Sequence, residues 1–112
     1  MTRIGRPIGL IGVIAFSLAC GHARAQDVGH AAAGLALARQ ICSECHAVER
    51  TQPLSPNPAA PRFEAIANVS GMTAMALSAA LQSPHRTMPN VMLNATELSY
   101  IVAYILSLQR AN

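Results

Sequence analysis

The sequence contains no lysine and no tryptophan, and only 12% of its 112 residues are charged. All eight basic residues are therefore arginines, and three of them lie in the first 24 positions. The five arginines that follow are matched by five acidic side chains, so the charges of this part sum to about zero. Nucleic acids and anionic membranes are bound through an excess of positive charge. The composition therefore supports neither as a partner.

The chain also lacks an apolar run long enough to cross a membrane. Residues 8–19 are uncharged, but a membrane-spanning helix needs roughly 20 apolar residues. This run follows Arg3 and Arg6 and precedes the small-x-small sequence Ala23-Arg24-Ala25, which is the pattern of a cleavable export signal. We therefore expect an exported protein without a transmembrane span.

The boundary of this signal divides the chain. We expect residues 1–25 to be a signal peptide and residues 26–112 to form one periplasmic domain. Cys20 ends the apolar run, so attachment of a lipid to it stays an alternative, although Ser17 stands where such signals usually have leucine. A domain this small buries a modest fraction of its surface and often needs a covalent staple or a cofactor.

The part after the signal shows helical patterns and no alternation typical of a half-buried strand, so we predict an all-α fold. Gly34 lies inside an alanine-rich helical pattern, which indicates close packing of that helix. Thr73 and Asn94 are candidate N-caps, and Glu97 completes a capping box with Asn94. The expected helices span about 30–42, 62–68, 74–82 and 95–110, with irregular proline-containing loops at 51–61 and 84–93.

The strongest motif is Cys42-Ser43-Glu44-Cys45-His46, the C-x-x-C-H spacing of c-type haem attachment. Two thiols on one turn can each add to a haem vinyl group, and the adjacent imidazole can bind the iron. A disulfide is the alternative in an exported protein. A zinc site would need further ligands such as His30 and His85, and a thioredoxin-like motif would need a βαβ unit that the pattern does not show.

An iron bound by His46 needs a sixth ligand or an open face. Met88 is our candidate, because it lies in an irregular loop between Pro84 and Pro89 that can hold a thioether in place. Met72 and Met75 lie in or next to a helical pattern, where methionine usually fills a core. Two alternatives stay open: His85 as the ligand, and Met92, which otherwise would cover the haem face as a core residue.

With these residues the chain resembles small monohaem bacterial cytochromes c of the mitochondrial type (class I) from residue 34 to 108. The resemblance implies three to four helices around one covalently attached haem c, with the first and last helices crossing. It implies that Gly34, eight residues before Cys42, lies at this crossing with Ile101 and Tyr104. The aromatic residue that the family usually has four positions later is Ala38 here.

The resemblance also implies roles around the haem. The carbonyl of Pro61 would accept a hydrogen bond from the second ring nitrogen of His46, and Phe63 would pack on the haem. Arg62 or Arg86 would lie near a propionate, or be solvated surface. The haem-binding set expected from motif and resemblance together is Cys42, Cys45, His46, Pro61 and Met88, with His46 and Met88 as iron ligands.

An iron with both axial positions filled has no place for a substrate, so we expect an electron carrier rather than an enzyme. Its partners would be periplasmic redox proteins such as a dehydrogenase, a reductase or a terminal oxidase. Two alternatives remain: the haem subunit that accepts electrons within a periplasmic dehydrogenase, and a gas sensor whose methionine ligand is displaceable.

Overall fold

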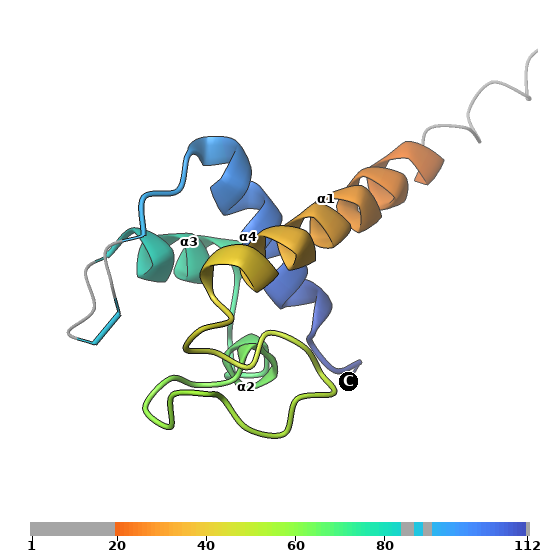
Figure 1. The fold of residues 1–112 in the computed structure, drawn as a ribbon. Coiled ribbons are helices and arrows are strands. Elements are labelled where there is room, and N and C mark those ends of the chain that lie inside the picture. Colours follow the sequence, from red (N-terminus) through yellow and green to blue (C-terminus); the bar gives the residue numbers. More distant parts are fainter. Residues whose placement is uncertain (1–19, 84–86, 89–90, 112) are drawn as a thin grey trace, which may run out of the picture.

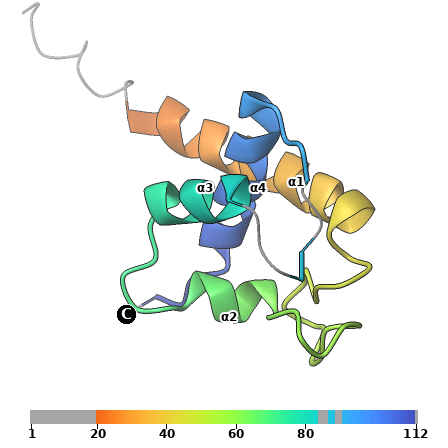
Figure 2. The same ribbon diagram turned by 90° about the vertical axis from the view of Figure 1, so that its left-hand side faces the viewer.

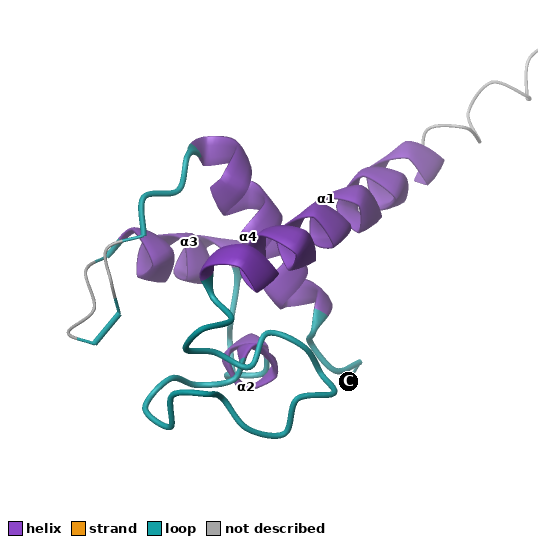
Figure 3. Ribbon diagram, viewed as in Figure 1, coloured by secondary structure: helices purple, strands orange, loops and turns teal. Residues whose placement is uncertain are grey.

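The computed structural model describes residues 20–83, 87–88 and 91–111. This part of the chain contains four α-helices and no strand, which confirms the predicted all-α class (Figures 1 and 3). None of its helices is long and apolar enough to cross a membrane. The helices are α1 (Cys20–Ile41), α2 (Phe63–Ala67), α3 (Ala74–Gln82) and α4 (Ala95–Ser107).

Helix α1 crosses helix α4 in close contact, as Figure 2 shows. Gly34 makes this possible. A Cβ atom at position 34 would overlap the backbone carbonyl oxygen of Tyr100 and lie 2.6 Å from the Cβ atom of Tyr104. The predicted close packing at Gly34 is therefore confirmed, and Ala38, one turn further along α1, is completely buried.

Helix α1 begins about ten residues earlier than predicted. Residues 20–29 contain no proline, so nothing in the backbone stops a helix from extending through them once the alanine-rich part is formed. Figure 1 shows this first part extending beyond the other helices. The expected cleavage site at 23–25 lies within α1, and residues 1–19 of the expected signal lie outside the described part.

Helices α3 and α4 begin at their predicted N-caps. The side chain of Thr73 accepts a hydrogen bond from the amide of Ala76 at 3.2 Å, so α3 begins where expected. The side chain of Asn94 accepts from the amides of Thr96 and Glu97, and the Glu97 carboxylate accepts from the amide of Asn94, all at 2.9 Å. The predicted capping box of α4 is therefore confirmed.

Helix α4 ends at Ser107, three residues before the predicted end. The amides of Leu108 and Gln109 still donate to carbonyls of the last turn, and side-chain contacts then hold the tail. The amide of Arg110 donates to the side-chain oxygen of Asn68 at 2.9 Å, and the Gln109 side chain donates to the carbonyl of Met72 at 3.2 Å. These contacts with the segment after α2 redirect the chain, and a helical pattern cannot anticipate them.

The core lies between α4 and the three other helices. Its buried residues come from every helix and from the segment after the Cys-His motif, with Ile101, Ile105 and Val48 as the largest side chains that are fully buried. The buried residues that pack against one another are Ala38, Val48, Phe63, Ala67, Leu77, Ile101, Val102, Tyr104, Ile105 and Leu108. The predicted irregular loop at 51–61 is indeed non-helical and connects this core to α2.

Candidate functional site

A cavity of about 230 Å³ opens beside the core, bounded by the end of α1, the Cys-His turn, the loop at 57–61, and parts of α2, α3 and α4. Most of its wall is apolar. Two thiols, an imidazole and a thioether are among the side chains that line it, from Cys42, Cys45, His46 and Met88. The apolar part of the wall includes Ile41, Phe63, Ile66, Leu77, Leu81, Val91, Leu93, Ile101 and Ile105.

The two cysteines reach the cavity because the chain continues to turn after α1. The amide of Cys42 donates to the carbonyl of Ala38 at 2.9 Å, and the amides of Cys45 and His46 donate to the carbonyl of Cys42 at 3.2 and 2.9 Å. This compact turn brings both thiols and the imidazole to one side. Both cysteines are free thiols, half-buried. Burial raises the pKa of the Cys42 thiol to about 11, which keeps it protonated at neutral pH.

The ring of His46 is held by a backbone carbonyl. Its Nδ1 lies 2.7 Å from the carbonyl oxygen of Pro61, and because a carbonyl can only accept, Nδ1 is the protonated nitrogen. A neutral imidazole protonated at Nδ1 has its lone pair on Nε2, which is the form that binds metals. The ring of Phe63 lies 5.4 Å from that of His46, centroid to centroid. The hydrogen bond that the resemblance implies is thus present.

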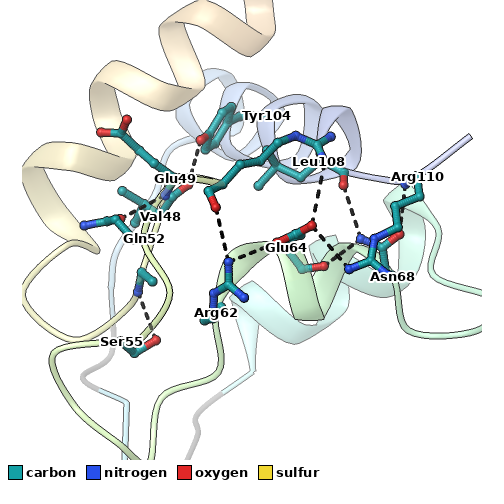
Figure 4. A network of polar contacts seen from close by, with 12 residues as sticks. Val48, Glu49, Gln52, Ser55, Arg62, Glu64, Asn68, Tyr104, Leu108 and Arg110 are labelled. Carbon is teal, nitrogen blue, oxygen red and sulfur yellow. Dashed lines mark hydrogen bonds and ion pairs between the residues drawn. The ribbon is translucent and has the colours of Figure 1, made fainter.

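Residues 45–48 around His46 are held by hydrogen bonds to two other parts of the fold, the loop at 51–61 and helix α4. The amide of Ala47 donates to the Ser55 hydroxyl at 3.0 Å, and the Tyr104 hydroxyl donates to the carbonyl of Val48 at 2.6 Å (Figure 4). The amide of Asn57 donates to the carbonyl of Cys45 at 3.1 Å. Burial, and then the negative charge of Glu49, raise the pKa of Tyr104, which keeps this donor protonated.

The methionines that the structure describes differ clearly in burial. Met88 is half-buried and lines the cavity, and Met72 packs partly buried against the core. Met75 was expected to fill a core, but it is 82% exposed on the outer face of α3. Met92, expected to cover the haem face if it is not a ligand, is 84% exposed, so that interpretation is wrong as well. The other ligand candidate, His85, lies outside the described residues.

Of the two arginines expected near a propionate or at the solvated surface, the structure describes Arg62. Arg62 does not line the cavity; its guanidinium group lies 3.0 Å from a carboxylate oxygen of Glu64. Arg86 lies outside the described residues. Glu44, between the two cysteines, borders the cavity and is exposed to solvent. The part of the chain that the structure describes contains no group of three or more His, Cys, Asp or Glu side chains suited to a metal ion, so it does not supply a four-ligand zinc site.

Sequence reasoning missed two features of this site. Asn57 lines the cavity, which its position in a proline-rich loop did not signal. Glu64 lies within 4 Å of three arginines, namely Arg50, Arg62 and Arg110, which are separated by up to 60 positions. Only the folded backbone brings them together, so no spacing in the sequence could have indicated the cluster.

Comparison of the chain with models of protein families, with curated proteins and with solved structures found no match.

Proposed function

We propose that this protein is a periplasmic c-type cytochrome that carries single electrons on one covalently attached haem. One observation carries the proposal. Two thiols, an imidazole with its Nδ1 already engaged, and a thioether line the same apolar cavity. Three of these groups come from one turn, whereas Met88 comes from a segment more than 40 residues away. A porphyrin is a large apolar ring, and this donor set and wall fit its edge and its iron.

Attachment of the haem would use Cys42 and Cys45. Each S–H group adds across one vinyl double bond: a carbon–sulfur bond forms, the proton goes to the other vinyl carbon, and no oxidant is consumed. The two thiols are separated by one turn of chain, so they can reach two vinyl groups on one face of the ring.

His46 and Met88 would be the axial ligands. The hydrogen bond from Nδ1 to Pro61 fixes the ring plane and increases the basicity of Nε2 toward the metal. A methionine in the sixth position raises the reduction potential relative to a second histidine. A haem held in this way supplies a one-electron couple, and the protein contributes orientation, a dry environment and an edge from which electrons leave.

With both axial positions filled, we assign the protein an electron-transfer role between periplasmic redox proteins. The neighbours would be a dehydrogenase, a reductase or a terminal oxidase, either as separate proteins or with this chain as the haem subunit of a dehydrogenase. Co-purification from the native host separates these two arrangements, because a subunit stays bound to its dehydrogenase and a free carrier does not.

The attachment is tested with Cys42→Ser and Cys45→Ser in a host that attaches c-type haem outside the cytoplasm. Intact mass of the wild-type protein is expected to increase by one haem that survives denaturation. Each single variant loses one thioether bond, and the double variant retains no haem after denaturation. Ser43→Ala, in the same turn, is the control and keeps both bonds. A double variant that retains haem after denaturation would overturn the proposal.

A further inference from the structure

Segment 61–63 carries the Pro61 carbonyl that accepts from the His46 ring. The contacts that hold this segment therefore also determine the orientation of the His46 ring. The amide of Phe63 donates to the carbonyl of Ala47 at 3.0 Å, which ties the segment to the residue directly after the histidine. The side chain between these two contacts is that of Arg62. Its role depends on the function proposed above, in which His46 is an iron ligand.

Arg62 connects segment 61–63 to Arg50, at the start of the proline-rich loop. Its Nη2 atom lies 3.3 Å from the carbonyl oxygen of Arg50 and 3.0 Å from the Glu64 carboxylate. Arg50 follows His46 by four residues, and Arg62 directly follows Pro61. One guanidinium group therefore joins the two ends of the proline-rich loop at 51–61, and Figure 4 shows its contacts with Glu64 and their neighbours.

The position of the Arg62 side chain costs free energy that a fully solvated arginine would not lose. Its Nε atom is buried and has no hydrogen-bond partner. Leaving a buried donor unpaired destabilises a fold, so such an atom calls for an explanation. The explanation that the contacts offer is the placement of Nη2, which reaches both a backbone carbonyl and a carboxylate only when the side chain lies in this position.

Arg110 provides the contrast. It contacts the same carboxylate, with Nη2 3.4 Å from Glu64, but its side chain is 74% exposed, against 31% for Arg62. It belongs to the C-terminal tail and is not adjacent in sequence to any residue that contacts His46. Removing either arginine removes one positive charge beside Glu64, so the two positions differ mainly in their connection to Pro61.

We propose that Arg62 is a positioning residue, which holds the carbonyl of Pro61 against Nδ1 of His46 and so fixes the orientation of the proximal iron ligand. Arg62 touches neither the cavity nor the imidazole and acts only through the backbone of its own segment. Loss of its guanidinium group should loosen one hydrogen bond at the ligand without removing any ligand.

The experiment uses the haem-loaded, reduced protein and measures solvent exchange of the His46 Nδ1–H proton by NMR. Loss of one net hydrogen bond corresponds to roughly three- to tenfold more frequent opening, so Arg62→Met should exchange faster by that factor. Arg62→Lys, which retains a cationic donor, should lie closer to the wild type. Arg110→Met should exchange at the wild-type rate. If Arg62→Met does not load haem, Arg62→Gln takes its place with the same expected direction.

Equal exchange rates in Arg62→Met and Arg110→Met, with haem bound to His46 in both, would overturn this inference and leave the proposed function intact. A wild-type protein without covalent haem, or with haem that His46 does not ligate, would instead overturn the proposed function. The two failures are therefore distinguishable in the same set of samples.

Discussion

The helix crossing and the cavity use neighbouring faces of α4, the crossing at Tyr100 and Tyr104 and the cavity at Ile101 and Ile105, and they solve opposite packing problems. At the crossing, Gly34 removes a side chain so that two backbones can touch, and every neighbouring core position is filled. At the cavity, apolar side chains surround about 230 Å³ of space that the chain itself does not fill. A cavity with apolar walls destabilises a fold, because its lining loses packing contacts. The comparison indicates that the fold depends on a bound group at the cavity and on close packing of α1 against α4 at the crossing.

The largest expected effect is that of the bound group itself. Attachment of haem should raise the free energy of unfolding by several kcal/mol, because the ring fills the apolar cavity in the native state and is exposed to water in the unfolded state. Denaturant unfolding of haem-loaded wild type and of the unloaded Cys42→Ser/Cys45→Ser double variant would measure it. Equal midpoints for the two proteins would show that the cavity is not completed by haem.

The second-largest expected effect on stability concerns the crossing of α1 and α4. Gly34→Ala should destabilise the protein by roughly 1–3 kcal/mol despite the better helix propensity of alanine, because the new methyl group meets the backbone of Tyr100, which cannot move aside as a side chain can. Ala36→Leu, on an exposed position of the same helix, is the control and should be nearly neutral. A stabilised Gly34→Ala variant in thermal unfolding would contradict the close crossing.

The smallest expected effect on stability concerns the hydrogen bond that the Tyr104 hydroxyl, at the helix crossing, donates to the carbonyl of Val48, two residues after His46. Tyr104→Phe should cost about 1 kcal/mol at neutral pH. Because the pKa of Tyr104 is raised in the folded state, its contribution is complete below the ordinary tyrosine value of 10.0 and is lost as the pH rises above it. Wild-type stability should therefore fall more steeply above pH 10 than that of Tyr104→Phe.

Tyr100→Phe is the control for this pH dependence, since it removes a tyrosine from the same helix that is only partly buried. Urea unfolding midpoints across this pH range are the measurement. If Tyr104→Phe and wild type lose stability in parallel, the hydroxyl of Tyr104 does not remain protonated in the folded state in the way its burial implies.

The sequence predicted best those features that depend on residues close together in the chain. Thr73 and the pair Asn94 and Glu97 cap their helices as expected, because a cap needs only its own helix. Gly34 was recognisable because a glycine within an alanine-rich helix is unusual. The Cys-His turn was likewise predictable as a unit from its spacing.

The features that the sequence did not predict depend on distant contacts. Met75 has neighbours typical of a buried methionine, but α3 packs against α4 with this side chain facing outward, and Met92, in the segment before α4, is exposed as well. The end of α4 depends on Asn68, which lies some 40 residues earlier and binds the tail. The contacts of Arg62 with Arg50 and Glu64 likewise form only when the loop closes.

The most direct test of a His46/Met88 haem is the absorption spectrum of the oxidised, haem-loaded protein. We expect the methionine-to-iron charge-transfer band in the wild type, its loss in Met88→Ala, and its retention in Met75→Ala, whose side chain is 82% exposed. This result would establish the axial ligand and with it the carrier role. A wild-type spectrum without the band, or a band that survives in Met88→Ala, would contradict the account and favour a gas-binding or bis-histidine haem.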